Sequence, residues 1–229
     1  MTTPPAPLAP RTRERLAAAL LAAFALAVLA DLGSLLAGAE TGHRIAKPLL
    51  MPLLAAFVAV RGGPRTLVAA LLLGWGGDVF LLLDAAWAFL AGMGLFALGH
   101  LCYLRLFGRA APPRGLGPLY AVLLVAAVAL LWPGLPAELR LPVAGYAALL
   151  AFTAWRASAL GAVVGAGGAL FLVSDLIIAT GIAGLPQPPA ADFWIMFLYC
   201  AAQLTLALGV LTASARTLPG APAPDGRAG

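Results

Sequence analysis

Charged residues are scarce in this 229-residue chain. They make up 10% of the sequence, whereas 62% of the residues are hydrophobic. A soluble domain of this size carries about 25% charged residues, so this chain has too few to cover a surface in contact with water. Uncharged runs over residues 115–137, 157–174 and 193–215 reach the length of about 18 residues that spans a bilayer as a helix. The runs are continuously apolar rather than alternating, which excludes a membrane β-barrel. The composition therefore predicts an all-α, polytopic membrane protein.

Several signatures of soluble enzymes are missing as well. The two histidines, His43 and His100, do not have the H-x-x-x-H spacing of a zinc site. The chain has no G-x-S-x-G elbow, no P-loop and no dinucleotide fingerprint. The two cysteines, Cys102 and Cys200, both fall inside predicted helices and cannot form a disulfide framework. Any chemistry must therefore use carboxylates supported by lysine or tyrosine, and we expect no metal and no cofactor.

Eight predicted spans, separated by short connections, form a transmembrane domain over residues 16–213. The first apolar run is longer than the h-region of about 7–15 residues in a signal peptide, so we interpret it as a span. The second span is short, with Pro48 and Pro52 in its first turns, where proline is tolerated. Residues 1–15, which are basic and proline-rich, and residues 214–229 are predicted to be disordered tails. The expected spans are 16–37, 46–60, 66–83, 86–106, 116–134, 140–155, 158–182 and 192–213.

The basic residues orient the predicted bundle. With the N-terminus in the cytoplasm, eleven of the 14 lysines and arginines fall on the cytoplasmic side and three on the outer side. This bias obeys the positive-inside rule, and an even number of spans returns the C-terminus to the cytoplasm. Because the basic residues are dispersed singly between spans, the net charge of +5 does not indicate a nucleic-acid partner. The cytoplasmic set is Arg11, Arg13, Arg15, Arg61, Arg65, Arg105, Arg109, Arg114, Arg156, Arg216 and Arg227, and the outer set is Arg44, Lys47 and Arg140.

Ionisable residues inside membrane spans are rare and are functional candidates by default. At about 1.5 Å of rise per residue, Asp78 and Asp175 reach a similar depth, and Lys47 falls in the same outer half of the bilayer. We predict that these side chains converge on one polar cavity opening toward the outer leaflet, together with Asp31, Tyr146, Tyr199 and Gln203, and that His100 lies at its floor. Asp84 is expected at the solvated end of the third span. The intramembrane candidates are Asp31, Lys47, Asp78, His100 and Asp175.

Neutral polar residues accompany them. Tyr199 and Gln203 are i,i+4 neighbours on the last span, and Tyr146 lies in the outer half of the sixth. Ser174 directly precedes Asp175. A stripe on the fourth span ends in two hydrogen-bonding side chains and consists of Phe89, Gly92, Phe96, His100 and Tyr103.

Structural interpretations compete with these functional ones. One aspartate can form a buried ion pair with Lys47, or Lys47 can extend to the surface without another role. For His100 we favour a hydrogen-bonded core residue over a catalyst. Asp31 lies near the end of its span, so solvation is its favoured explanation. The tyrosines are equally well explained as packing residues.

Five segments together resemble the YhhN/TMEM86 family in order and spacing. They are "KPLLMP" (47–52), "GD" (77–78), F-x2-G-x3-F-x3-H-x2-Y (89–103), "GALFLVSDLII" (168–178) and "YCAAQ" (199–203). The resemblance covers the second to the eighth span. Characterised members are lysoplasmalogenases, eight-span enzymes that hydrolyse the vinyl ether bond of lysoplasmalogens to a fatty aldehyde and a glycerophospho-base. The resemblance implies that Asp78 and Asp175 match the family's presumed catalytic aspartates. It also implies a lysophospholipid substrate, membrane lipids as partners and a place in the bacterial inner (plasma) membrane.

The implied chemistry suits buried carboxyls. A vinyl ether is hydrolysed by proton transfer to its β-carbon, followed by capture of the oxocarbenium ion by water. Two carboxyls in different surroundings can divide the roles of general acid and general base. The alternative is a proton-coupled transporter of a small molecule or lipid that uses the same buried charges as a relay. A third alternative is a lipid-binding module without turnover.

Overall fold

Every regular element in the part of the chain that the structure describes is helical. The structure is a computed structural model that describes residues 9–83 and 85–216. Asp84, Arg227 and most of the two predicted tails lie outside these residues. The elements are α1 (Pro10–Leu36), α2 (Glu40–Val60), α3 (Arg65–Leu81), α4 (Ala86–Phe107), α5 (Leu116–Leu131), α6 (Ala137–Ala157), the short 3-10 helix η1 (Ser158–Leu160), α7 (Ala162–Ile182) and α8 (Ala191–Arg216).

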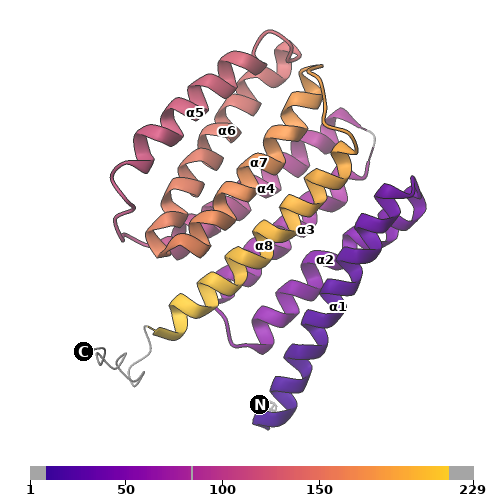
Figure 1. Cartoon of the computed structure of the whole chain (residues 1–229), viewed down its shortest axis with the longest axis vertical. Helices are drawn as coiled ribbons and strands as arrows, with labels where there is room; N and C mark the ends of the chain where they lie inside the picture. The colour runs from indigo at the N-terminus through magenta and orange to yellow at the C-terminus, as the bar shows by residue number, and fades with distance from the viewer. Residues whose placement is uncertain (1–8, 84, 217–229) are drawn as a thin grey trace, which may run out of the picture.

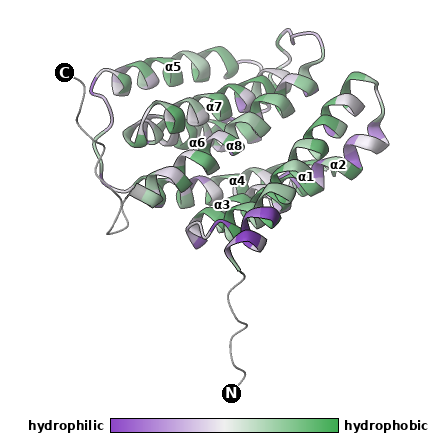
Figure 2. Ribbon diagram, turned by 60° about the horizontal axis from the view of Figure 1, so that its bottom comes forward, coloured by the Kyte–Doolittle hydropathy of each residue, from purple (hydrophilic) through white to green (hydrophobic). Residues whose placement is uncertain are grey.

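The helices have the length and surface of membrane spans. Six of the described helices are long and apolar enough to cross a bilayer, namely α1, α2, α4, α6, α7 and α8. The other two, α3 with 17 residues and α5 with 16, are slightly shorter. Most residues of the helices are hydrophobic, and hydrophilic residues gather near the start of α1 and around the α1–α2 connection (Figure 2). The prediction of an all-α, multi-pass integral membrane protein is confirmed.

Helix α8 occupies the middle of the bundle. It packs along α7 and also contacts α1, α2 and α3, while α5 lies at the periphery against α6 and α7 (Figure 1). The pairs α1–α2 and α3–α4 pack closely as well. α1 begins and α8 ends at the same end of the bundle (Figure 1), as an even number of spans requires. Which end faces the cytoplasm stays a prediction.

Two helices, α1 and α2, begin six residues earlier than the sequence analysis expected. α1 starts at Pro10, so residues 10–15 are helical and are not part of a disordered tail; proline at the first helical position has a suitable φ and needs no hydrogen-bond donor. α2 starts at Glu40 instead of residue 46, with the Glu40 carboxylate in the first turn, where the helix dipole favours negative charge. Pro48 and Pro52 therefore lie in the interior of α2 rather than at its start.

A tryptophan on α3 compensates for the two prolines. In an α-helix the carbonyl of Pro48 would accept a hydrogen bond from the backbone N–H of residue 52, but Pro52 has none. The indole Nε1 of Trp75 donates to the Pro48 oxygen instead, at 2.9 Å. This bond ties α2 to α3 beside the segment that carries Lys47.

We expect the Trp75→Phe variant to lower the free energy of unfolding by about 1 kcal/mol, the usual net contribution of one hydrogen bond. The measurement is thermal unfolding of the purified protein in detergent. Trp87→Phe is the matched control, because the Trp87 indole donates no hydrogen bond within the described residues. Equal unfolding midpoints for the two variants would contradict the role assigned to Trp75.

Glycines bring α3 and α4 close together near Asp78. A Cβ atom added at Gly77 would lie 2.6 Å from the Phe96 ring, and one added at Gly92 would lie 3.1 Å from the Gly77 carbonyl oxygen. Neither position therefore accepts a side chain without displacing its neighbour. The close approach places Phe96 directly against the turn of α3 that carries Asp78.

Candidate active site

Asp78 and Asp175 line the same cavity in the interior of the helical bundle. We call it the aspartate cavity; its volume is about 70 Å³. Asp78 comes from α3 and Asp175 from α7, and the remaining lining is apolar except for Lys47, Tyr146, Ser174 and Tyr199. The lining residues are Lys47, Asp78, Leu81, Phe89, Met93, Phe96, Val143, Tyr146, Ser174, Asp175, Ile178, Ala179, Ile182, Ile195, Met196 and Tyr199.

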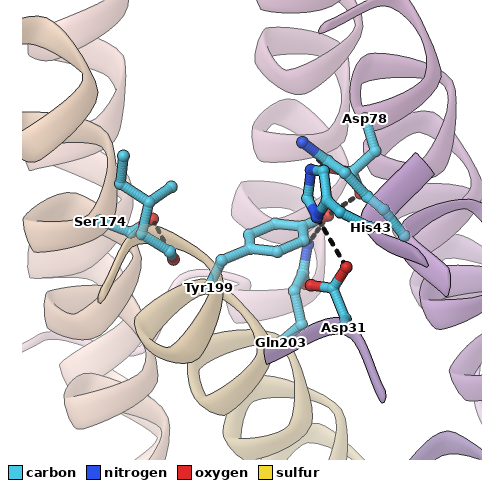
Figure 3. Close-up of polar contacts among 8 residues, drawn as sticks. Asp31, His43, Asp78, Ser174, Tyr199 and Gln203 are labelled. Carbon is cyan, nitrogen blue, oxygen red and sulfur yellow. Dashed lines mark hydrogen bonds and ion pairs between the residues drawn. The ribbon is translucent and has the colours of Figure 1, made fainter. Parts of the chain in front are cut away.

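Asp78 is buried beside a phenol and a cation. The Tyr199 hydroxyl donates a hydrogen bond to Asp78 Oδ2 at 2.7 Å (Figure 3). Lys47 Nζ lies 4.0 Å from Asp78 Oδ1, and Lys47 is itself buried. The charge that Asp78 carries when ionised is therefore met by a buried ammonium from α2.

Asp175 has different surroundings. The Tyr146 hydroxyl on α6 donates to Asp175 Oδ2 at 2.7 Å, and among the described residues Asp175 forms no ion pair. The neighbouring Ser174 hydroxyl donates to the Ile195 carbonyl oxygen at 3.0 Å and so ties α7 to α8. The two aspartates thus share a cavity, but only Asp78 has a cation beside it.

A buried chain of hydrogen bonds supports Tyr199. Gln203 Nε2 donates to the Tyr199 hydroxyl at 3.4 Å, and the Tyr103 hydroxyl donates to Gln203 Oε1 at 2.5 Å. Phe96 and Phe171 pack edge-on against the Tyr199 ring. Tyr103 and Gln203 lie outside the aspartate cavity, and they fix the position of the phenol that contacts Asp78.

Asp31 is buried, contrary to the favoured expectation that solvent covers it. Its side chain is 0% exposed, and its Oδ1 accepts a hydrogen bond from His43 Nδ1 at 2.7 Å (Figure 3). α2 extends one and a half turns further than expected, so it carries His43 over the end of α1 and covers the carboxylate.

His100 is not at the floor of the cavity. It is buried against the rings of Phe171, Tyr103 and Tyr146, with the Phe171 centroid 4.5 Å away. Neither ring nitrogen has a hydrogen-bond partner in the described part of the chain. His100 lies one turn beyond Phe96 on the same face of α4, and Phe96 lines the cavity. The aromatic packing therefore separates His100 from the two aspartates.

Two further cavities adjoin the aspartate cavity. The polar cavity, about 430 Å³, lies between the α1–α2 connection, the start of α2, the end of α3 and the start of α8. It shares Lys47, Leu81, Ile195 and Met196 with the aspartate cavity. The apolar cavity, about 220 Å³, lies between α5, α6 and α7 and shares Val143, Tyr146, Asp175 and Ala179 with it.

The sequence analysis missed a polar stripe on α2. Glu40, His43, Arg44 and Lys47 follow the i, i+3, i+4, i+7 spacing of one helix face, and all four line the polar cavity. The spacing was visible in the sequence. A helix that begins only at residue 46 contains just one of the four residues, Lys47, and therefore shows no stripe.

A bundle of apolar helices enclosing two carboxyls, a lysine and two phenols defines an integral membrane protein with a polar site in its interior. The chain belongs to the YhhN family, which it matches over residues 42–210. No solved structure matches it.

Curated relatives carry names that describe an activity. Lysoplasmalogenase TMEM86A of Bos taurus is 36% identical over 148 residues, which cover 59% of this chain and 60% of that protein. Lysoplasmalogenase TMEM86B of Homo sapiens is 35% identical over 66% of this chain and 65% of that protein. A lysoplasmalogenase of Mycobacterium bovis (strain ATCC BAA-935 / AF2122/97) is 32% identical over 74% of this chain and 72% of that protein. The chain thus spans somewhat less than two thirds of the length of the two mammalian relatives.

Proposed function

We propose that this chain is a membrane hydrolase that cleaves the vinyl ether bond of lysoplasmalogens to a fatty aldehyde and a glycerophospho-base. The observation that carries the proposal is the pair of carboxyls, Asp78 and Asp175, in one apolar cavity of a YhhN-family chain. The names of its relatives support the choice of substrate. Acid–base catalysis by these two aspartates, inside the membrane, is the mechanism that the geometry favours.

Asp175 is the better proton donor of the two. An adjacent cation favours the ionised form of a carboxyl, and Lys47 stands beside Asp78, whereas Asp175 has only the Tyr146 phenol as a partner in the described part of the chain. Tyr146 occupies Asp175 Oδ2, which leaves Oδ1 for the proton. Transfer of this proton to the β-carbon of the vinyl ether breaks the carbon–carbon π bond and gives an oxocarbenium ion.

Asp78 serves the second half of the reaction. Its carboxylate stabilises the oxocarbenium ion electrostatically and accepts a proton from the water that attacks the cationic carbon. The product is a hemiacetal, and its collapse breaks the carbon–oxygen bond to the glycerol. Asp78 gives its newly gained proton to the glycerol oxygen, and Asp175 takes the proton of the hemiacetal hydroxyl. The aldehyde and the alcohol then leave, with Asp175 protonated and Asp78 ionised as at the start.

The substrate chain needs more room than the aspartate cavity provides. Its volume of about 70 Å³ admits several water molecules, at roughly 10–15 Å³ each, but not a long hydrocarbon. The apolar cavity continues from Asp175 and Tyr146 between α5, α6 and α7, and its remaining lining is hydrocarbon except for the hydroxyl-bearing Tyr120. We assign the alkenyl chain to this cavity.

Filling the apolar cavity is expected to shift the chain-length preference. Ala147 lines it, so Ala147→Phe should lower kcat/KM for a long-chain substrate about tenfold, because two or more methylene groups lose a buried place at about 0.8 kcal/mol each. A substrate with a short alkenyl chain should change less than twofold. Ala126→Phe, on an exposed position of α5 outside this cavity, is the control. Equal losses for both chain lengths would contradict the assignment.

The decisive test of the function is aldehyde release from lysoplasmenyl-ethanolamine and lysoplasmenyl-choline by the purified protein. Mass spectrometry must also find the matching glycerophospho-base, and an acyl lysophospholipid of equal chain length should not be cleaved. Substrate-dependent proton flux in proteoliposomes without bond cleavage would overturn the proposal in favour of a transporter.

We also propose the bacterial inner membrane as the location, with both ends of the chain in the cytoplasm. The ratio of eleven to three basic residues supports this orientation. Cysteine labelling from either side of intact cells tests it, and labelling of position 40 only from the cytoplasm would contradict it.

A further inference from the structure

The polar cavity is large and is lined by charged residues, so it suits a charged group better than a hydrocarbon chain. Its volume is about 430 Å³, against about 70 Å³ for the aspartate cavity, and the two cavities adjoin at Lys47, Leu81, Ile195 and Met196, which line both. Charged groups of both signs line its walls. The α2 stripe stands on one side and Asp192, in the first turn of α8, on another.

Lys47 lies where the two cavities meet, and its ammonium group has few polar contacts. The side chain is 11% exposed, and its ion pair with Asp78, at 4.0 Å, is longer than a hydrogen bond. Within the described residues its three N–H donors have no hydrogen-bond acceptor. A buried ammonium in this state is stabilised by any ligand that brings oxygen acceptors to the junction.

Arg44 and His43 lie about one turn before Lys47 on the same face of α2, and both line the polar cavity. Arg44 Nε and Nη2 both lie 2.9 Å from Glu40 Oε1, and Nη1 donates to the Leu82 carbonyl oxygen at 3.4 Å, so these contacts hold the guanidinium on the cavity wall. His43 Nδ1 is engaged by Asp31, so Nε2 is the ring nitrogen left for a ligand. The guanidinium, with its forked donors, is the side chain best suited to a phosphate.

We propose that the polar cavity binds the zwitterionic phosphodiester head group of the lysophospholipid. Lys47 and Arg44 contact the phosphate, His43 closes the site beside them, and the amine faces Asp192. This inference rests on the proposed function and adds the orientation in which the substrate binds. The head group lies in the polar cavity, the glycerol passes Lys47, and the vinyl ether lies between Asp78 and Asp175.

The test compares lipids that differ only in the phosphate. For an alkenyl lysophosphoethanolamine, Arg44→Gln should lower kcat/KM about tenfold, as expected for the loss of one charge-assisted contact. For the alkenylglycerol of the same chain length, which lacks the phosphate, the change should be less than twofold. Arg140→Gln is the control, because Arg140 contacts Trp132 and the Leu135 carbonyl and does not line the polar cavity. Equal losses on both lipids, or no loss on either, would overturn the head-group assignment.

A binding measurement separates this inference from the proposed function. A saturated 1-O-alkyl lysophosphoethanolamine has no vinyl ether and cannot be cleaved, so its Kd does not depend on turnover. Arg44→Gln should raise this Kd about tenfold relative to that of the matching alkylglycerol, even if the wild-type protein releases no aldehyde. An unchanged ratio of the two Kd values would overturn the assignment.

Two soluble competitors identify the source of the phosphate. Glycerophosphoethanolamine should compete with the alkyl lysophospholipid for the wild-type protein and compete less for Asp192→Asn. Inorganic phosphate at the same concentration should compete weakly. Competition by inorganic phosphate as strong as that by glycerophosphoethanolamine would mean a free-anion site and would overturn the head-group assignment.

Discussion

Either aspartate-to-asparagine substitution in the aspartate cavity is expected to lower kcat about a thousandfold, within the range that one general acid or base contributes. Asparagine keeps the size of the side chain and accepts the hydrogen bond of Tyr199 in Asp78→Asn, or of Tyr146 in Asp175→Asn. It neither donates a proton to carbon nor accepts one from water. The measurement is the single-turnover rate of aldehyde release at saturating lysoplasmenyl-ethanolamine.

Controls distinguish lost chemistry from lost structure. Glu138→Gln removes an exposed carboxylate at the start of α6 and should change kcat less than twofold. Asp175→Asn should unfold near the wild-type temperature, because no cation stands beside Asp175 in the described part of the chain. Asp78→Asn should unfold earlier, because it leaves the buried Lys47 ammonium without its partner. Aldehyde release by both at more than a tenth of the wild-type rate would contradict the proposed mechanism.

The rate-limiting step has its own signature. Proton transfer to the β-carbon predicts a slower rate in deuterium oxide for the wild-type protein.

A double variant tests whether the two aspartates act together. If Asp175 is the donor and both residues serve one reaction, their effects are not multiplicative. Adding Asp78→Asn to the Asp175→Asn variant should therefore slow the reaction by a smaller factor than Asp78→Asn does in the wild-type protein. Fully multiplicative losses would place the two aspartates in independent roles.

The close approach of Asp78, Lys47 and Tyr199 could be predicted because the sequence contains few charged residues. A charge inside an uncharged run stands out, and counting spans from the positive-inside bias gives each charge a depth. Polar side chains at equal depth avoid the lipid, so in a small bundle they meet in its interior. The pairing of Asp175 with Tyr146 was less accessible, since it depends on which helices are neighbours, and α6 lies against α7 for packing reasons that periodicity does not reveal.

The errors have local physical causes. Pro48 and Pro52 suggested a helix start, yet the Trp75 indole replaces the hydrogen bond that Pro52 cannot donate, so α2 continues back to Glu40. A helix that begins only at residue 46 places His43 in the connection before it and gives Asp31 no partner, whereas in the structure the two side chains form a hydrogen bond. His100 shares a helix face with Phe96, but helix periodicity does not predict how far a cavity extends along that face, and only Phe96 lines the cavity.

Removing the ammonium of Lys47 is expected to have the second largest effect. Lys47→Met keeps the volume of the side chain but leaves the Asp78 carboxylate, on the turn of α3 facing α2, without its cation. Breaking a buried pair from one side costs up to about 3–5 kcal/mol, and the ion pair here is long and adjoins a cavity, so we expect about 2 kcal/mol. The unfolding temperature in detergent should fall, and kcat/KM should fall about a hundredfold.

A double-mutant cycle separates the stability of the pair from its function. Asp78→Asn in the Lys47→Met background removes the uncompensated charge, so the unfolding temperature should return to near that of the wild type while aldehyde release stays absent. Lys47→Arg, which keeps the charge, should retain most of the stability. If Lys47→Met unfolded no earlier than the wild type, the two residues would not be energetically coupled, and the ionised state of Asp78 would need a different source of stabilisation than Lys47.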